Sequence, residues 1–131
     1  MSNIPEELVY TESHEWVRKE SDGSITVGVT DHAQSMLGDL VFVDLPEEEL
    51  EVSRDEECCV LESVKAAADV YAPVSGVIVE VNHELDSTPE VINKEPYDAG
   101  WLFRMIPSDE KEFEDLLDAE AYQECVKAEA H

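Results

Sequence analysis

The amino-acid sequence predicts one mostly β domain, a compact sandwich or barrel of short antiparallel strands with helices only at its margins. Three observations support this prediction. The chain has 131 residues, which is the usual length of a single domain. Short runs rich in β-branched and aromatic residues alternate with turn-forming residues over most of the chain. Hydrophobic residues make up 43% of the total, which is enough to build a core and argues against extensive disorder.

Seven of these runs are expected to be strands. They cover residues 15–19, 25–29, 40–45, 58–64, 69–72, 77–81 and 101–106. The first two should pair as a hairpin, because apolar residues alternate along the second and the turn cluster Ser-Asp-Gly-Ser separates them. Pro46 and Pro107 should each end a strand. Residues 47–57 contain seven acids in eleven positions, so we expect a solvated connector there.

Short helices are predicted between some of the strands. Thr30 and Asp31 can cap a helix over residues 32–37, and Gly38 should end it. Thr88 precedes a proline, which is the pattern of a cap followed by proline at the first helical position.

The C-terminal tail, about residues 108–128, is predicted to be helical and to pack as a lid on a core of about residues 8–106. Asp109 with Glu112 has the spacing of a capping pair. Apolar side chains at helical spacing would face the sheet; they are Phe113, Leu116 and Leu117, followed by Tyr122, Cys125 and Val126.

The charge balance excludes two broad functions. The chain has 33 acidic residues against 8 lysines and arginines, a formal charge of −25. Phosphate backbones and anionic lipid surfaces would repel it, so a general nucleic-acid or peripheral-membrane role is excluded. Partners should instead meet it through basic patches.

The lack of a recognisable targeting signal and the pattern of cysteines favour the cytoplasm. The N-terminus has neither a basic region nor a long apolar stretch, and no apolar run approaches the roughly 20 residues of a membrane span. Cys58, Cys59 and Cys125 lack CxxC spacing, and we interpret them as structural thiols in a reducing compartment. The mitochondrial matrix would fit if a transit peptide had been removed.

Known catalytic and metal motifs are missing from the sequence. The residues at positions 14–15 begin like the zinc-protease pattern HExxH, but Arg18 stands where the second histidine belongs. The other histidines are scattered, at His32, His83 and His131. We therefore expect neither a metal site nor a catalytic residue.

One lysine stands apart from the acidic background. Lys65 is the only lysine between Lys19 and Lys94, and it lies between two predicted strands, where a hairpin tip is expected. Its neighbours Ser63 and residues 66–68 are small, which leaves its amine accessible. An ordinary lysine, with a pKa of about 10.4, is a poor nucleophile at neutral pH. An attachment point is therefore a better functional interpretation of Lys65 than a catalytic nucleophile. From spacing alone, a solvated turn lysine is the alternative.

The chain also resembles a known family along nearly its whole length. The segments that carry the likeness are YTESHEWV, VGVTDHAQ, LGDLVFVDLP, ESVKAA, DVYAPVSG, VIN, PY and GW, in that order. These segments resemble the H proteins of the glycine cleavage system. The resemblance implies a single lipoyl-carrier domain over residues 1–131. Its fold would be a lipoyl/biotinyl-carrier-like barrel-sandwich hybrid of two short antiparallel sheets, with a modified lysine at a hairpin turn.

The resemblance also implies roles for individual residues. Lys65 matches the lysine that carries covalent lipoate, and a lipoate-attaching enzyme would read Glu62, Ser63, Val64 and Ala66 around it. A second set, Ser13, Glu15 and Asp69, matches a cleft that would shelter the loaded lipoyl arm.

The implied activity is transport, with catalysis performed by partners. The H protein would accept an aminomethyl group from glycine decarboxylase (P protein) and present it to the folate-dependent aminomethyltransferase (T protein). Dihydrolipoamide dehydrogenase (L protein) would then reoxidise the dithiol. The expected cofactor is lipoate and the expected state is a monomer.

Other carriers fit less well. A biotin carrier would have methionines beside the lysine, where Val64 and Ala66 stand, and a lipoyl domain of a 2-oxo-acid dehydrogenase typically presents Asp-Lys-Ala. A protein that donates its lipoyl group to other enzymes remains an alternative. Family members usually have glycine where this chain has Glu49 and Asp55, and Ser or Thr in place of Ala68.

Overall fold

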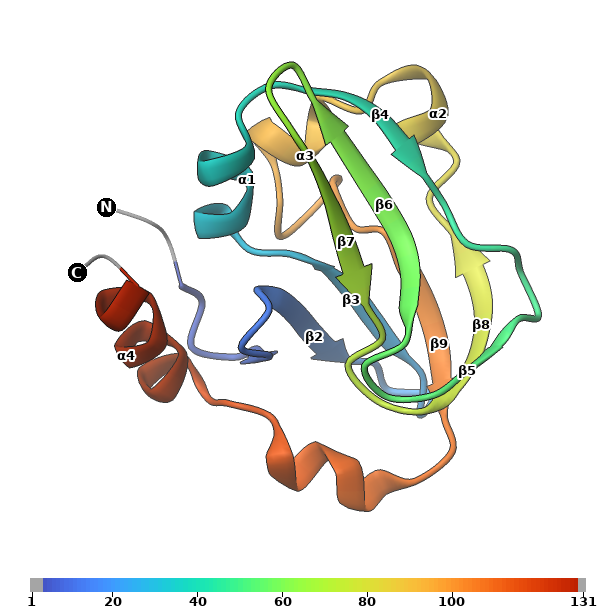
Figure 1. Ribbon diagram of the computed structural model, residues 1–131. Helices are drawn as coiled ribbons and strands as arrows, with labels where there is room; N and C mark the ends of the chain where they lie inside the picture. The colour runs from blue at the N-terminus through green and yellow to red at the C-terminus, as the bar shows by residue number, and fades with distance from the viewer. Residues whose placement is uncertain (1–3, 130–131) are drawn as a thin grey trace.

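The computed structural model describes residues 4–129 and consists of two facing antiparallel sheets with helices around them (Figure 1). The larger sheet has the strand order β1-β2-β3-β9-β8-β5. Its strands are β1 (Val9–Tyr10), β2 (Glu15–Lys19), β3 (Ile25–Val29), β9 (Phe103–Pro107), β8 (Gly76–Val81) and β5 (Glu51–Val52). The smaller sheet has the order β4-β6-β7, with β4 (Leu40–Asp44), β6 (Glu57–Ser63) and β7 (Ala67–Tyr71). The mostly β, two-sheet prediction is confirmed.

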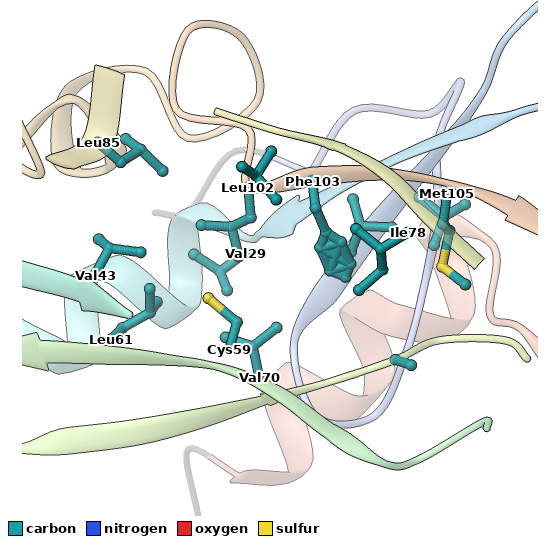
Figure 2. Close-up of a cluster of buried hydrophobic side chains, with 14 of the residues drawn as sticks. Val29, Val43, Cys59, Leu61, Val70, Ile78, Leu85, Leu102, Phe103 and Met105 are labelled. Atoms are coloured by element: carbon teal, nitrogen blue, oxygen red, sulfur yellow. The ribbon is translucent and has the colours of Figure 1, made fainter. Parts of the chain in front are cut away.

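The hydrophobic core lies between the two sheets (Figure 2). Val29 and Phe103 from the larger sheet and Leu61 and Val70 from the smaller one are all buried there. Apolar side chains alternate along these strands because successive residues point to opposite faces of a sheet. β3 pairs with both β2 and β9, so the predicted first hairpin sits in the middle of the larger sheet.

The first helix forms as predicted. It is α1 (Asp31–Leu37), and the Thr30 side chain caps it by accepting a hydrogen bond from the Ala33 N–H at 3.2 Å. Gly38 ends it with φ of +83°, and its N–H donates to the Gln34 carbonyl at 3.0 Å. A positive φ is what glycine tolerates without steric cost.

The predicted cap at Thr88 is wrong. Thr88 follows the end of α2 (Glu84–Ser87) and donates its N–H to the Glu84 carbonyl, while α3 (Val91–Lys94) begins after Glu90. The Val91 N–H donates to the Thr88 carbonyl at 3.2 Å, so residues 88–90 form a tight turn between two one-turn helices. Proline suits such a turn as well as it suits a helix start.

The predicted capping pair in the tail is half right. Asp109 does cap the 3₁₀ helix η1 (Glu110–Asp115), by accepting the Lys111 N–H at 3.0 Å. Glu112 instead accepts hydrogen bonds from the Ser75 N–H at 2.6 Å and the Ser75 hydroxyl at 3.1 Å. The Glu112 side chain thus ties the tail to the end of the barrel.

The apolar residues of the tail do not share one helical face. Phe113 and Leu116 pack on the main core, but Leu117 exchanges two backbone hydrogen bonds of 2.7 Å with Tyr10 and joins a second cluster. The final helix α4 (Ala119–Glu129) buries Tyr122 in that cluster, where its ring stacks on Tyr10 at 4.7 Å. The chain is extended between η1 and α4, which divides the lid into two parts.

The acidic connector and the cysteines differ in detail from expectation. Residues 47–57 are largely exposed, but β5 lies within them, pairs with β8 and buries Val52. Cys59 is buried and Cys58 is half-buried, and burial raises the pKa of the Cys58 thiol to about 12. Such thiols are inert at neutral pH, as a structural role requires.

None of the helices within residues 4–129 is both long enough and apolar enough to cross a membrane. Of the scattered histidines, His83 is exposed, and its Nδ1 atom lies 3.5 Å from Asp86 Oδ2. His131 lies outside the described residues.

Candidate functional site: the Lys65 hairpin and the cleft beside β7

Lys65 lies in the turn between β6 and β7, and this hairpin turn is at the top of the view in Figure 1. The two strands pair up to Glu62 and Ala67, and the Ser63 N–H donates to the Ala66 carbonyl at 2.7 Å to close the turn. The Ser63 hydroxyl accepts the N–H groups of Lys65 at 3.3 Å and Ala66 at 3.0 Å. It also lies 3.1 Å from the Ala66 carbonyl, to which it donates. The backbone beneath the lysine is therefore well fixed.

A second element supports the hairpin from the side. The Val64 N–H donates to the Asp39 carbonyl at 3.1 Å, which joins the tip to the loop after α1. A β-carbon built on Gly38 would lie 3.2 Å from Lys65 Cε, so the aliphatic part of Lys65 crosses that glycine. The lysine stem rests on protein while its amine remains in solvent, a common arrangement for long cationic side chains.

The residues expected to guide lipoate attachment surround the tip. Glu62, Val64 and Ala66 are exposed, and Ser63 is half-buried because it holds the turn. Val64 is 70% exposed, which is unusual for a valine and leaves an apolar contact next to the lysine. Further exposed apolar side chains, Met36, Val41 and Phe42, lie on α1 and on β4, the strand that pairs with β6. An enzyme can therefore reach Lys65 and its neighbours directly.

Glu15 is almost completely buried, with 1% of its surface exposed. One carboxylate oxygen accepts the hydroxyls of Thr11 at 2.5 Å and Ser13 at 2.6 Å. The other accepts the Tyr71 N–H at 3.3 Å. Burial raises the pKa of Glu15, and the three hydrogen bonds oppose that rise. Glu15 thus joins the loop before β2 to the edge strand β7 of the other sheet.

Ser13 lines a cleft of about 570 Å³ beside the C-terminal end of β7. Its other walls are Thr11, Glu12, Arg54, Asp55, Tyr71, Pro73, Asp115, Leu116 and Leu117. Glu15 lies behind Ser13. Asp69 is exposed on β7, at a position in the sequence between Lys65 and the cleft residue Tyr71. Of the three predicted cleft residues, only Ser13 is on the cleft wall.

Sequence reasoning missed the ion pair at the cleft rim. Arg54 Nη1 lies 2.7 Å from Asp115 Oδ2, and both residues line the cleft. Arg54 is the only basic residue in the acidic connector, which is a signal that the sequence does contain. The partner residue comes from η1, 61 positions later, and no sequence pattern connects the two.

Two facing sheets with an exposed lysine at a hairpin tip define a carrier domain of the lipoyl type. A solved glycine cleavage system H protein from Mycobacterium marinum has this fold. It superposes on the chain with a TM-score of 0.81 at 42% identity, covering 91% of this chain and 95% of that one.

The sequence pattern of the glycine cleavage H-protein family matches residues 8–129, and the chain belongs to that family. The glycine cleavage system H protein of Escherichia coli O7:K1 (strain IAI39) is 59% identical over 129 residues, which is 98% of this chain and 100% of the relative. The protein of that name from Salmonella typhimurium (strain LT2) is 58% identical with the same coverage. Family membership supports a role as a lipoate carrier in glycine cleavage.

Proposed function

We propose that Lys65 carries lipoate as an amide and that this chain shuttles a one-carbon unit between the enzymes of glycine cleavage. The observation that carries the proposal is the position of Lys65, exposed at the tip of a hairpin whose backbone is held by the Ser63 hydroxyl and by the Asp39 carbonyl. When bound, lipoate supplies a redox-active disulfide that takes up the aminomethyl group of glycine. The group would come from the P protein and pass to the T protein, and the L protein would restore the disulfide.

The residues of the hairpin perform the chain's own part of this function. Amide formation removes the charge of Lys65 and leaves a long flexible arm, while the fixed turn determines where the arm begins. The attaching enzyme would read the exposed side chains of Glu62, Val64 and Ala66. Ser63 would act mainly through the turn, because its hydroxyl is occupied by backbone groups.

The buried Glu15 gives Ser13 a role in sheltering the loaded arm. Because an ionised Glu15 only accepts hydrogen bonds, the Ser13 hydroxyl must donate its proton to it, which leaves the oxygen lone pairs of Ser13 as acceptors. A terminal ammonium on the arm needs such acceptors once water is excluded. Glu15 therefore orients Ser13 from behind, and Asp69 would act from the exposed face of β7.

Intact-mass measurement tests the attachment site. The purified chain is incubated with lipoate, ATP and a lipoate ligase, beside Lys65→Arg and the matched control Lys94→Arg, which changes an exposed lysine on α3. We expect one lipoyl group on the wild type and on Lys94→Arg, and none on Lys65→Arg. Modification of Lys65→Arg, or no modification of the wild type when the E. coli relative is modified, would contradict the assignment.

A further inference from the structure

Three potential metal ligands that are far apart in the sequence meet where α4 packs on the rest of the molecule. His14 precedes β2, His32 lies on α1, and Glu129 is the last residue of α4. His14 Nε2 is 2.9 Å from Glu129 Oε2, and His32 Nε2 is 3.9 Å from Glu129 Oε1. One ligand atom from each residue lies within 4.8 Å of the other two.

We propose that His14, His32 and Glu129 form a binding site for a divalent transition-metal ion of the Zn²⁺ class. Two imidazoles and one carboxylate are a common set of zinc ligands, with Zn–N and Zn–O distances of about 2.0–2.2 Å. Ligand atoms around such an ion lie about 3.3 Å apart, so the present cluster, whose atoms lie within 4.8 Å of one another, needs to contract by up to roughly 1.5 Å. Glu129 can supply part of that movement because its side chain is 43% exposed at a helix end, and the two imidazole rings must supply the rest.

His32 gives the first independent indication of a missing ligand. Its Nε2 atom is buried and has no hydrogen-bond partner among the residues that the structure describes. Buried polar atoms in proteins nearly always have a partner, and an exception needs an explanation. A metal ion bound between His32 and Glu129 would satisfy this nitrogen.

His14 gives the second indication, because its other ring nitrogen is already held. His14 Nδ1 lies 2.8 Å from the Tyr122 hydroxyl, which is in turn 2.6 Å from the Thr30 hydroxyl. If His14 donates to Tyr122 and Tyr122 donates to Thr30, Nε2 keeps its lone pair and points at Glu129. Outer-shell hydrogen bonds of this kind orient metal-bound histidines. The backbone of His14 is also held at φ of +75°, an uncommon conformation for a residue other than glycine.

The choice of metal follows from the ligands. Ca²⁺ and Mg²⁺ prefer shells made entirely of oxygen, whereas imidazole nitrogen selects zinc and other late first-row ions. Three protein ligands leave one position for water. A bound ion would connect α4 to β2 and α1, and it would fix the loop that presents Ser13 beside His14.

The expectation of no metal site came from the spacing of histidines along the chain. His14 and His32 do not form a local motif, and Glu129 is 115 residues from His14, so only the packing of α4 brings the three together.

The test uses the untagged, metal-stripped chain without lipoate, so its result does not depend on the proposed function. Co²⁺ is titrated while the visible absorption of the bound ion is recorded, and Zn²⁺ is then used to displace it. We expect one ion per chain, displacement by Zn²⁺ but not by Mg²⁺, and a higher unfolding temperature when Zn²⁺ is present.

Variants locate the site. His32→Ala removes no hydrogen bond that the structure shows, and Glu129→Gln changes an exposed carboxylate, so both should fold. Each should weaken Co²⁺ binding by at least about tenfold, since even outer-shell changes have that effect. The matched control is His83→Ala, which removes an exposed histidine near Asp86 and should bind as the wild type does.

Three results would overturn the site. The first is the absence of a change in Co²⁺ absorption in the wild-type chain. The second is binding that neither His32→Ala nor Glu129→Gln weakens. The third is equal weakening in His83→Ala, which would indicate diffuse attraction of cations to a chain with a charge of −25.

Discussion

Glu15 shows how the environment of a single residue changes its interpretation. The family resemblance placed it in a cleft that shelters the arm, whereas the structure buries its carboxylate against Thr11, Ser13 and the Tyr71 N–H. We therefore propose that Glu15 acts on the cleft through Ser13. A buried carboxylate with three donors is also a structural element, so its removal should affect folding as well as function.

Substitutions at positions 13 and 15 should separate these two effects. Glu15→Ala leaves partly buried donors unpaired and should lower the free energy of unfolding by about 2–3 kcal/mol. It should also shorten the lifetime of the aminomethyl-loaded protein. Ser13→Ala should shorten that lifetime with less than about 1 kcal/mol of destabilisation, because Ser13 is exposed. Denaturant unfolding and the rate of ammonia release measure the two quantities.

Ser21→Ala, which changes an exposed serine in the turn before β3, is the control and should match the wild type in both measurements. A wild-type lifetime in both Ser13→Ala and Glu15→Ala would remove these residues from the sheltering role.

The backbone at Glu49 and Asp55 has the conformation that suits the glycines expected at these positions from the family resemblance. Both residues have positive φ, +70° and +71°, which glycine adopts without steric cost. Glu49→Gly should raise the free energy of unfolding by about 1 kcal/mol, because a left-handed conformation costs an ordinary residue that much. Asp55→Gly should raise the free energy of unfolding by less, since aspartate tolerates this conformation better. Equilibrium unfolding in urea checks both, and a loss of stability in Glu49→Gly would contradict the explanation.

At the scale of elements, Gly38 couples α1 to the lysine hairpin. Its φ of +83° and ψ of −160° fall in a region that is essentially restricted to glycine. Gly38→Ala should lower the free energy of unfolding by about 1–3 kcal/mol, and its β-carbon would crowd Lys65 Cε at 3.2 Å. We therefore also expect slower lipoylation, measured by mass against time.

Gly23→Ala provides the matched control. Gly23 has a similar φ of +91°, but a β-carbon there would contact nothing within 4 Å, so only stability should fall. Equal lipoylation rates in Gly38→Ala and the wild type would show that the contact with Lys65 has no role in attachment.

Elements with a strong local pattern were predictable from the sequence. Residues 15–19 and 25–29 form strands with those bounds, because alternating apolar residues and a clear turn define them. The two-residue strands β1 and β5 carry too little pattern to be recognised, and β5 lies inside an acidic run. The position of Leu117 beside Tyr10 depends on long-range pairing, which local propensity does not contain.

The same distinction applies to the candidate site. The place of Lys65 at a hairpin tip was predictable because its segment combines a turn, small neighbours and an isolated positive charge, whereas its role as an attachment site was inferred from the family resemblance. The Arg54–Asp115 pair and the His14–His32–Glu129 cluster were not, because their members lie on elements that meet only in the folded chain.

At the scale of the whole molecule, charge is the dominant feature. A net charge of −25 opposes compaction, and added salt screens that repulsion. Raising NaCl from about 0.05 to about 0.5 M should therefore raise the unfolding temperature by several degrees. Binding to the P protein should weaken over the same range, because salt also screens attraction to basic patches. An unfolding temperature that falls with salt, measured by calorimetry, would contradict this view.

The most direct test of the central claim follows the one-carbon unit itself. The lipoylated chain is incubated with P protein and glycine labelled with ¹³C at its α-carbon, and its peptides are mapped by mass spectrometry. We predict that the label appears on the peptide containing Lys65 and that Lys65→Arg acquires none. Absence of label from that peptide, while the same P protein loads the E. coli relative, would contradict the account.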